Sequence, residues 1–354
     1  MGAPATSERV GESEGRSPSD DLMHARITRV APLRAVDGGT LLIEGEHLPY
    51  DPPPRVTIAD AEAHVASASP RHLRIVVPAE LDGGQVPLKV DAVPGGTVLI
   101  EVGTTLATGV HQVDNPAFDR DGNLYATFSG SRENRVPVTL FRVRRDGVRE
   151  PIRVDIPNPT SVAVGRDGAL YVSSRFEGSV YRVDPATQNL RVFASNLGSP
   201  FGLAFDRAGN LWVGDRSGTI FRVDADGAAE AVAGLPASIA AFHLAIGPDD
   251  AVYVSAPTLS PRDRVFRIAP GSGNVETVLE GLGRPQGMAF DPQGRLHVVE
   301  AMAGDAGVWR YDLSAGDIRG ERVLAAGSLV GLAFDPGGGM VVAGSDTLWR
   351  LDVI

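Results

Sequence analysis

The sequence predicts an all-β protein in which an N-terminal β-sandwich precedes a six-bladed β-propeller. The first observation is a strand motif, an aromatic residue followed by Arg, that recurs six times between residues 141 and 350. The second is its spacing, because the aromatic residues stand 40, 40, 45, 43 and 40 residues apart. A period of 40–45 residues with four short strands per unit is typical of propeller blades. The third is the segment 25–100, which has its own strand pattern and lacks the repeat.

Residues 1–24 are expected to form a disordered tail. The stretch MGAPATSERVGESEGRSPSDD is rich in Ser, Glu and Gly and poor in apolar residues, so it cannot bury a core. It also lacks the apolar segment of a secretory signal. A cytoplasmic location is therefore the expectation.

The segment 25–100 is expected to be a β-sandwich. Its stretches ITRVAPLRAVDGGTLLIEGEHLP and RVTIADAEAHVASASPRHLRIVVP alternate apolar and polar residues and are interrupted by Gly-Gly turns. Short alternating strands between such turns predict two packed antiparallel sheets.

Residues 101–354 contain the repeats. Each unit has four strands, and the stretch 199–235 shows them most clearly. Turns such as DRDGN and DRAGN place Asp and Gly where a tight connection needs a side-chain cap and a positive φ. The Arg of each motif is expected to pair with turn carboxylates. Small side chains suit the crowded inner strands, and one alanine recurs there: Ala117, Ala163, Ala204, Ala245, Ala289 and Ala333.

The last unit, which begins near residue 329, contains only three strands before the printed sequence ends. The segment 102–108 resembles the fourth strands of the other units. We therefore expect 102–108 to pair with the last motif strand in blade six. Such a pairing joins the two ends of the ring and covers an edge strand.

The composition excludes several classes of partner and chemistry. The chain has 33 Lys and Arg against 44 Asp and Glu, a net charge of −11, so neither nucleic acid nor an anionic membrane is an expected partner. With no cysteine, the chain has no disulfide and no thiolate ligand. No apolar run reaches the length of a membrane span, so membrane insertion is not expected.

Two family resemblances follow from these motifs. The order of ITRVAP, GGTLLIEGEHL, RVTIADAEAHV, LRIVVP and GGQVPLKV resembles an immunoglobulin-like TIG (IPT) domain. The repeats resemble six-bladed propellers of the NHL-repeat and the senescence-marker-protein and gluconolactonase type, whose units also read PxGxAxD and GxLYVxD. This second resemblance implies a propeller and is less informative about activity.

Functional residues are expected at one mouth of the ring, where the links between blades and the loops between second and third strands emerge. The longest of these loops are 129–139, 256–264 and 301–307. The candidate binding positions are the first residues of inner strands and the last residues of second strands: Thr160, Ser174, Phe201, Asp215, Phe242, Gln286 and Glu300.

The gluconolactonase resemblance implies one divalent cation (calcium, magnesium or zinc) at the mouth. In that family a Glu, an Asn and an Asp hold it, and by position these fall on Asp114, Phe242 and Gln286. Asp114 and Gln286 remain candidate ligands. An aromatic ring and a neutral amide remove most of the charge that a hard cation requires.

A different cation site is also conceivable. It would consist of three carboxylates that face the mouth together, those of Asp114, Asp215 and Glu300. His243 stands where other units have Gly, and with Asp114 it is the candidate catalytic pair, as metal ligand or general base. The structural alternatives are that Asp215 caps its own loop, Glu300 pairs with a neighbouring Arg, and His243 is packed and hydrogen-bonded.

These observations favour a non-enzymatic binding or scaffold protein, a possible accessory subunit of a larger complex. It would dock a protein or a small molecule at the mouth. The alternative is a metal-dependent lactone hydrolase. Under either function, substituting Asp114 and His243 together is predicted to abolish binding and leave the melting temperature nearly unchanged.

Overall fold

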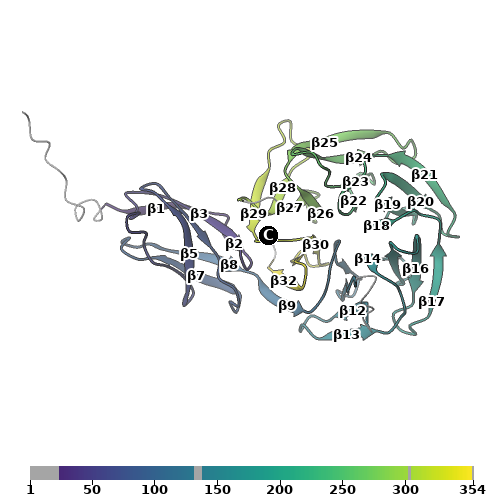
Figure 1. Cartoon of the computed structure of the whole chain (residues 1–354), viewed down its shortest axis with the longest axis horizontal. Helices are drawn as coiled ribbons and strands as arrows, with labels where there is room; N and C mark the ends of the chain where they lie inside the picture. Colours follow the sequence, from purple (N-terminus) through teal and green to yellow (C-terminus); the bar gives the residue numbers. More distant parts are fainter. Residues whose placement is uncertain (1–23, 131–137, 302–303, 353–354) are drawn as a thin grey trace, which may run out of the picture.

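A ring of antiparallel sheets occupies most of the chain, and a second group of strands lies beside it (Figure 1). The computed structural model describes residues 24–130, 138–301 and 304–352, and every regular element in them is a β-strand. Apart from its last residue, the predicted tail 1–24 lies outside these ranges. None of the described residues forms a helix able to cross a membrane.

The N-terminal strands share one hydrophobic core. β5 pairs with β6 through its C-terminal half and with β4 through its N-terminal half, so it connects β1-β3-β6 to β4-β7-β8. Leu41, Ile58, Leu73 and Leu88 are fully buried in this core. The strands are β1 (Arg26–Ala31), β2 (Arg34–Ala35), β3 (Thr40–Glu46), β4 (Val56–Ile58), β5 (Ala61–Ala68), β6 (His72–Val76), β7 (Gly84–Val90) and β8 (Thr97–Val102).

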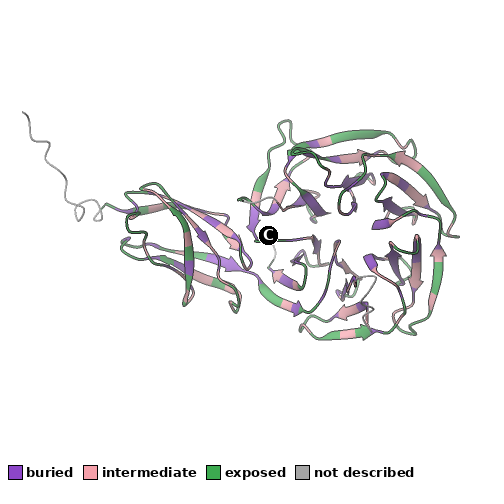
Figure 2. Ribbon diagram, viewed as in Figure 1, coloured by how far each residue is buried: buried purple, intermediate pink, exposed green. Residues whose placement is uncertain are grey.

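Five free-standing four-stranded sheets stand in the ring, and their inner strands are the most buried (Figure 2). Four of them follow the chain order from the inside outward. They are β10 (Ala117–Phe118), β11 (Leu124–Thr127), β12 (Leu140–Val143) and β13 (Arg149–Ile152); β14 (Pro159–Val164), β15 (Leu170–Ser174), β16 (Ser179–Val183) and β17 (Leu190–Ala194); β18 (Pro200–Phe205), β19 (Leu211–Asp215), β20 (Thr219–Val223) and β21 (Ala229–Gly234); and β22 (His243–Ile246), β23 (Val252–Ser255), β24 (Asp263–Ile268) and β25 (Val275–Leu282).

The fifth free-standing sheet closes the ring. It consists of β30 (Gly331–Phe334), β31 (Met340–Ala343), β32 (Thr347–Leu351) and, on its outside, β9 (Thr104–Thr108). β9 is antiparallel to β32, with Thr108 opposite Thr347 and Thr104 opposite Arg350. The expected closing segment 102–108 is thus shorter by two residues, because Val102 belongs to β8 and Gly103 separates the two strands.

The expectation of six separate blades needs a correction. The strands β26 (Pro285–Phe290), β27 (Leu296–Glu300), β28 (Gly307–Tyr311) and β29 (Glu321–Ala325) do not form a free-standing sheet. β2 pairs in parallel with both β29 and β8, so these four strands continue into the N-terminal strands as one twelve-stranded sheet. These four strands are not a separate sheet because the outer edge of β29, which a free-standing blade would leave exposed, pairs with β2.

The junction at β2 is closely packed. The Val36 amide donates to the Ala325 carbonyl at 2.9 Å, and Ala325 belongs to the N-terminal core. Val36 in turn packs into the ring. A Cβ on Gly39 would lie 2.5 Å from the Ala325 carbonyl oxygen, so a side chain there would separate the backbones. The two groups of strands are therefore held in a fixed relation.

The loop 301–307, predicted to be a wall of the mouth, contacts the N-terminal strands. Its residues 302–303 lie outside the described ranges. Asp305 pairs with Arg74 of β6 at 3.6 Å, and Arg74 also donates to the Gly304 carbonyl at 3.3 Å. The length of this loop is thus explained by a contact between the two parts of the chain.

Candidate functional site

Six inner strands surround the axis of the ring. β10, β14, β18, β22, β26 and β30 contact one another in this order, and β30 contacts β10 again. β10 and β22 therefore lie on opposite sides of the axis. The position two residues before the recurring alanine carries a small or polar residue in every strand: Asn115, Ser161, Gly202, His243, Gly287 and Gly331.

Asn115 occupies the space that two of these glycines leave. Its Nδ2 donates to the Met288 carbonyl at 3.0 Å, and its Oδ1 accepts from the Leu332 amide at 3.0 Å. A Cβ on Gly287 would lie 2.1 Å from that Oδ1, and one on Gly331 would lie 2.7 Å from the Asn115 Cα. Asn115 therefore fixes the segment before β10 against β26 and β30.

Asp114 and His243 meet across the axis. His243 Nδ1 lies 2.6 Å from Asp114 Oδ1, and the side chains are 0% and 3% exposed. Because a carboxylate oxygen accepts, Nδ1 is the donor in this contact. Nε2 is buried without a hydrogen-bond partner among the described residues. The pair predicted as catalytic is thus brought together by the fold.

Asp215 and Glu300 do not join this pair. Asp215 Oδ1 accepts from the Ser199 amide at 2.7 Å. Glu300 accepts from the amides of Gly283 at 2.6 Å and Arg284 at 2.7 Å. Burial raises the pKa of Glu300, and these two amides partly offset the rise. Both carboxylates hold the link that enters their own sheet.

The partner predicted for Glu300 needs a correction. An Arg side chain was the expected structural partner, but the carboxylate accepts from backbone amides, including that of Arg284. Ser174 has a related role, because its hydroxyl donates to the Pro157 carbonyl at 2.5 Å.

The remaining predicted positions are buried near the inner strands. Thr160 Oγ1 lies 2.7 Å from Ser173 Oγ, between the sheets that contain β14 and β18. Phe242 is fully buried in a hydrophobic cluster that also contains Phe201. Gln286 is 8% exposed, and its backbone carbonyl accepts from Ser255 at 2.6 Å. Among the predicted site residues that the structure describes, Asp114 and His243 are the one pair of titratable side chains in contact.

The donor set does not suit a divalent cation. Of the three positions implied by the resemblance, Phe242 offers no donor and Asp114 is engaged with His243. Within the described ranges, no group of three His, Asp or Glu side chains could hold a metal ion. A hard cation requires several oxygen ligands, which these residues do not supply. The three-carboxylate site of Asp114, Asp215 and Glu300 is likewise not formed.

Sequence reasoning missed Asn115. The same signal that singled out His243, a polar residue where other units have Gly, applies to Asn115 as well. Gln112 was also missed, although its Oε1 accepts from the Thr127 amide at 2.8 Å within the buried interior. No repeat position distinguishes Gln112, so the sequence gives no signal for it.

No protein-family model matches the chain. A curated protein named gluconolactonase, from Zymomonas mobilis, is 23% identical over 252 residues, which cover 67% of this chain and 61% of that protein. The chain thus matches about three fifths of that relative's length. The identity is too low to assign the chain to a family.

Solved structures share the fold. A gluconolactonase from Xanthomonas campestris aligns with a TM-score of 0.57 at 19% identity and covers 87% of this chain and 97% of that one. An auxiliary nutrient binding protein from Bacteroides thetaiotaomicron aligns with a TM-score of 0.55 at 12% identity and covers 92% and 97%. At such identities the likeness establishes the propeller fold alone.

Proposed function

We propose that the protein hydrolyses a lactone, with His243 as general base and Asp114 as the group that orients it. The observation that carries the proposal is the buried 2.6 Å contact between His243 Nδ1 and Asp114 Oδ1, which leaves Nε2 without a partner among the described residues. A carboxylate that fixes one imidazole nitrogen directs the other at a reacting group. The named gluconolactonases among the similar proteins support the choice of substrate class.

The chemistry needs only these two side chains and water. His243 Nε2 takes a proton from water as the water oxygen bonds to the lactone carbonyl carbon. The ring C–O bond then breaks, and the proton on Nε2 passes to the departing oxygen, giving a hydroxy acid. Asp114 accepts the Nδ1 hydrogen and stabilises the imidazolium that forms between these steps. Because both side chains are buried, water screens this attraction little.

The first experiment is a pH-stat assay with D-glucono-1,5-lactone. Asp114→Asn and His243→Gln are expected to lower kcat about 10²–10⁴-fold. The matched control is His111→Gln, because His111 is exposed and its ring packs on Phe128.

A single substitution can leave the other buried group without its partner, which is destabilising. The double variant Asp114→Asn/His243→Gln avoids an unpaired charge, and its melting temperature shows whether the ring still folds. Wild-type turnover no faster than that of a folded double variant would contradict the proposal. Assays with EDTA and with added Ca²⁺, Mg²⁺ or Zn²⁺ test whether turnover by this protein requires a divalent cation.

A second candidate is docking of a protein partner at the mouth. It is favoured by Leu259, whose side chain is 89% exposed in the loop 256–264, and by Ile239, which is 41% exposed in the preceding link. The Ile239 amide donates to the Pro257 carbonyl at 3.0 Å, so the two segments are adjacent. Replacing Leu259 with Ser should abolish capture of such a partner. Lactone turnover should be unchanged if only docking is lost.

The finer architecture is also a proposal. β26–β29 are antiparallel in chain order and β26 lies in the ring of inner strands, which supports their counting as a sixth blade. The shared core and the passage of β5 between two strand groups support an immunoglobulin-like sandwich of the TIG type over 25–100, followed by a propeller over 101–354.

A further inference from the structure

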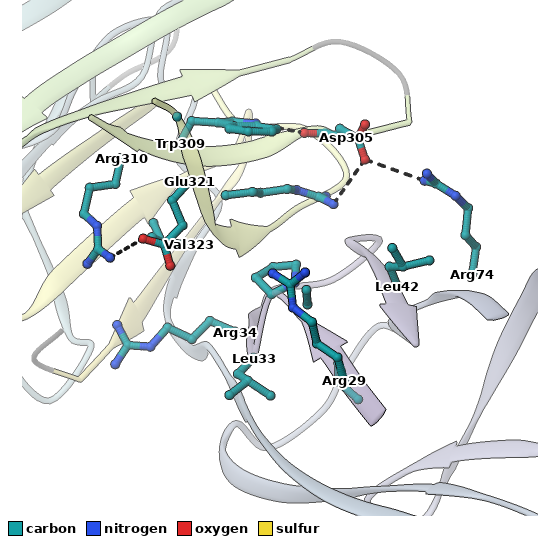
Figure 3. A pocket seen from close by; sticks show the side chains of 15 residues that line it. Arg29, Leu33, Arg34, Leu42, Arg74, Asp305, Trp309, Arg310, Glu321 and Val323 are labelled. Carbon is teal, nitrogen blue, oxygen red and sulfur yellow. Dashed lines mark hydrogen bonds and ion pairs between the residues drawn. The ribbon is translucent and has the colours of Figure 1, made fainter. Parts of the chain in front are cut away.

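We propose that the cleft between the N-terminal strands and β28–β29 binds a small molecule that carries a carboxylate or phosphate group (Figure 3). The cleft has a volume of about 710 Å³, within the range of roughly 300–1,000 Å³ that ligand sites occupy. It lies at the outer edge of the ring, away from the axis. The inference therefore does not depend on lactone hydrolysis.

The lining of the cleft is rich in positive charge. Asp305 and Glu321 are its only carboxylates, so cations exceed anions by three in the described lining. Glu44 and Glu101 pair with two of the cations from outside the lining, and one positive charge still remains. In a chain of net charge −11, such a region attracts anions. The cations are Arg29, Arg34, Arg74, Arg310 and Arg322.

Several of these ion pairs are long. One oxygen of Asp305 is shared by Arg74 at 3.6 Å and Arg322 at 3.7 Å, and Arg29 lies 3.8 Å from Glu44. These separations exceed hydrogen-bond distance. Since a guanidinium has five N–H donors, Arg29 and Arg74 retain donors for a ligand. Short bidentate contacts between these arginines and an oxyanion would be stronger than the long ion pairs that the arginines already form.

Arg322 adds a buried cation to the lining of the cleft. Its side chain is 11% exposed, and its Nε has no hydrogen-bond partner among the described residues. Its other nitrogens donate to the carbonyls of Thr40 and Ala306. Burial lowers the pKa of Arg322, Asp305 partly offsets this, and Arg74 lowers it further. An anion in the cleft would stabilise this charge.

The walls indicate the rest of the ligand. Trp309 forms one wall, with its Nε1 donating to the Asp305 carbonyl at 3.2 Å, and Pro32, Leu33 and Leu42 contribute apolar surface. A flat indole opposite apolar side chains accepts the ring carbons of a sugar while guanidinium groups hold its charge. We therefore infer a sugar acid or a sugar phosphate.

Calorimetric titration tests the site with D-glucuronate and D-glucose 6-phosphate, which distinguish the two oxyanions. Neutral D-glucose and chloride at equal ionic strength serve as reference solutes. Binding is expected to weaken at least about tenfold in Arg29→Gln/Arg74→Gln, because the variant loses charge-assisted hydrogen bonds to the oxyanion. The control is Arg55→Gln, an exposed arginine of the same strand group that pairs with Glu62 at 3.1 Å and does not line the cleft.

Melting curves establish that both variants fold. Loss of binding in the double variant with retention in Arg55→Gln supports the site. Two outcomes overturn it: wild-type protein that binds neither sugar anion, or a double variant that binds as tightly as wild type. Lactone turnover in the double variant is expected to equal that of wild type, so the two proposals fail separately.

Discussion

The Asp114–His243 contact joins residues that are distant in sequence and opposite in the ring, and its geometry depends on how each is held. His243 begins β22, whereas Asp114 precedes β10 in a link without regular structure. Asn115 supplies the missing support by bonding to Met288 and Leu332. It is a positioning residue, because it holds the neighbouring Asp114 and contributes no group to the chemistry.

Asn115→Ala is predicted to lower kcat for the lactone about tenfold with little change in KM, since Asp114 would lose its fixed position. It should also destabilise the fold by about 1–3 kcal/mol, because a buried amide and a buried carbonyl lose their partner. Kinetics and urea unfolding measure the two effects. The control is Asn123→Ala, which removes a contact with Asp119 in a turn. Unchanged kcat in a destabilised Asn115 variant would show that Asn115 only supports the ring.

His297 gives a pH dependence of stability. Burial lowers its pKa from 6.5 to about 4, while nearby Asp291 acts in the opposite direction. Between these values the unfolded chain binds a proton that the folded chain does not, so stability falls as the pH drops from 6.5 to about 4. The loss is up to about 3 kcal/mol. Urea unfolding at pH 7 and pH 4.5 should show a smaller difference in His297→Gln; an equal difference would assign the effect to other groups.

For single residues, the sequence was informative where the same position could be compared between repeat units. His243 could be found because other units have Gly at its position, and its contact with Asp114 could not, since no spacing indicates which blades face each other. Asp215 was expected to cap its own loop; its carboxylate accepts from Ser217 of that loop and also from the Ser199 amide in the link before β18. The amide partners of Glu300 were not visible in the sequence.

Among the elements, β32 depends on two distant parts of the chain. It pairs with β31 on one side and with β9 on the other. Trp349 of β32 is 8% exposed and packs against Gly344, whose Cβ would lie 3.0 Å from the indole ring. The closure of the ring thus rests on side-chain packing as well as on backbone hydrogen bonds.

Trp349→Ala is predicted to destabilise the protein by about 3–5 kcal/mol, the usual result of removing a buried indole. The expected result is a lower urea midpoint with a single transition. Val192→Ala is the control, because Val192 also lies on a blade strand but is 52% exposed. A midpoint equal to that of the control would show that the β9–β32 pairing is stable without this packing.

Strands and turns were the most predictable elements, because period and turn chemistry are local. Asp119 shows this: its carboxylate accepts from the amides of Asp121 and Asn123, while Gly122 has a φ of 79°. The motif arginines do pair with carboxylates, such as Arg182 with Asp167 at 2.7 Å. Several partners lie on fourth strands instead of turns, as Glu230 does for Arg222. The register between the third and fourth strands determines which carboxylate each arginine meets, and the sequence repeat does not indicate that register.

For the whole molecule, the junction at β2 determines whether the N-terminal strands and the ring unfold together or separately. Because one sheet continues from the N-terminal strands into β29, the two parts should unfold together. Gly39→Ala is predicted to lower the melting temperature and to split a single calorimetric transition into two, since its Cβ would lie 2.5 Å from the Ala325 oxygen. Gly234→Ala is the control, because a Cβ there meets nothing within 4 Å. Two transitions in the wild-type protein would contradict this coupling.

The junction was also what sequence reasoning could not anticipate. A propeller predicted from its period is a set of equivalent blades, and period carries no information on which blade edge meets another domain. The two-residue strand β2 is too short to stand out from a loop. For the same reason the contact between Asp305 in the loop 301–307 and Arg74 was not anticipated.

The pairing of β9 with β32 also has a consequence for synthesis. β9 leaves the ribosome early, and the residues that will cover it are translated only after all the intervening sheets. At ~5–20 residues per second, that interval is on the order of tens of seconds. Throughout this time the nascent chain presents an uncovered strand edge, which is a template for association with other chains. Slower elongation through this gene should therefore increase the insoluble fraction, and a circular permutant that makes 104–108 last should escape that sensitivity.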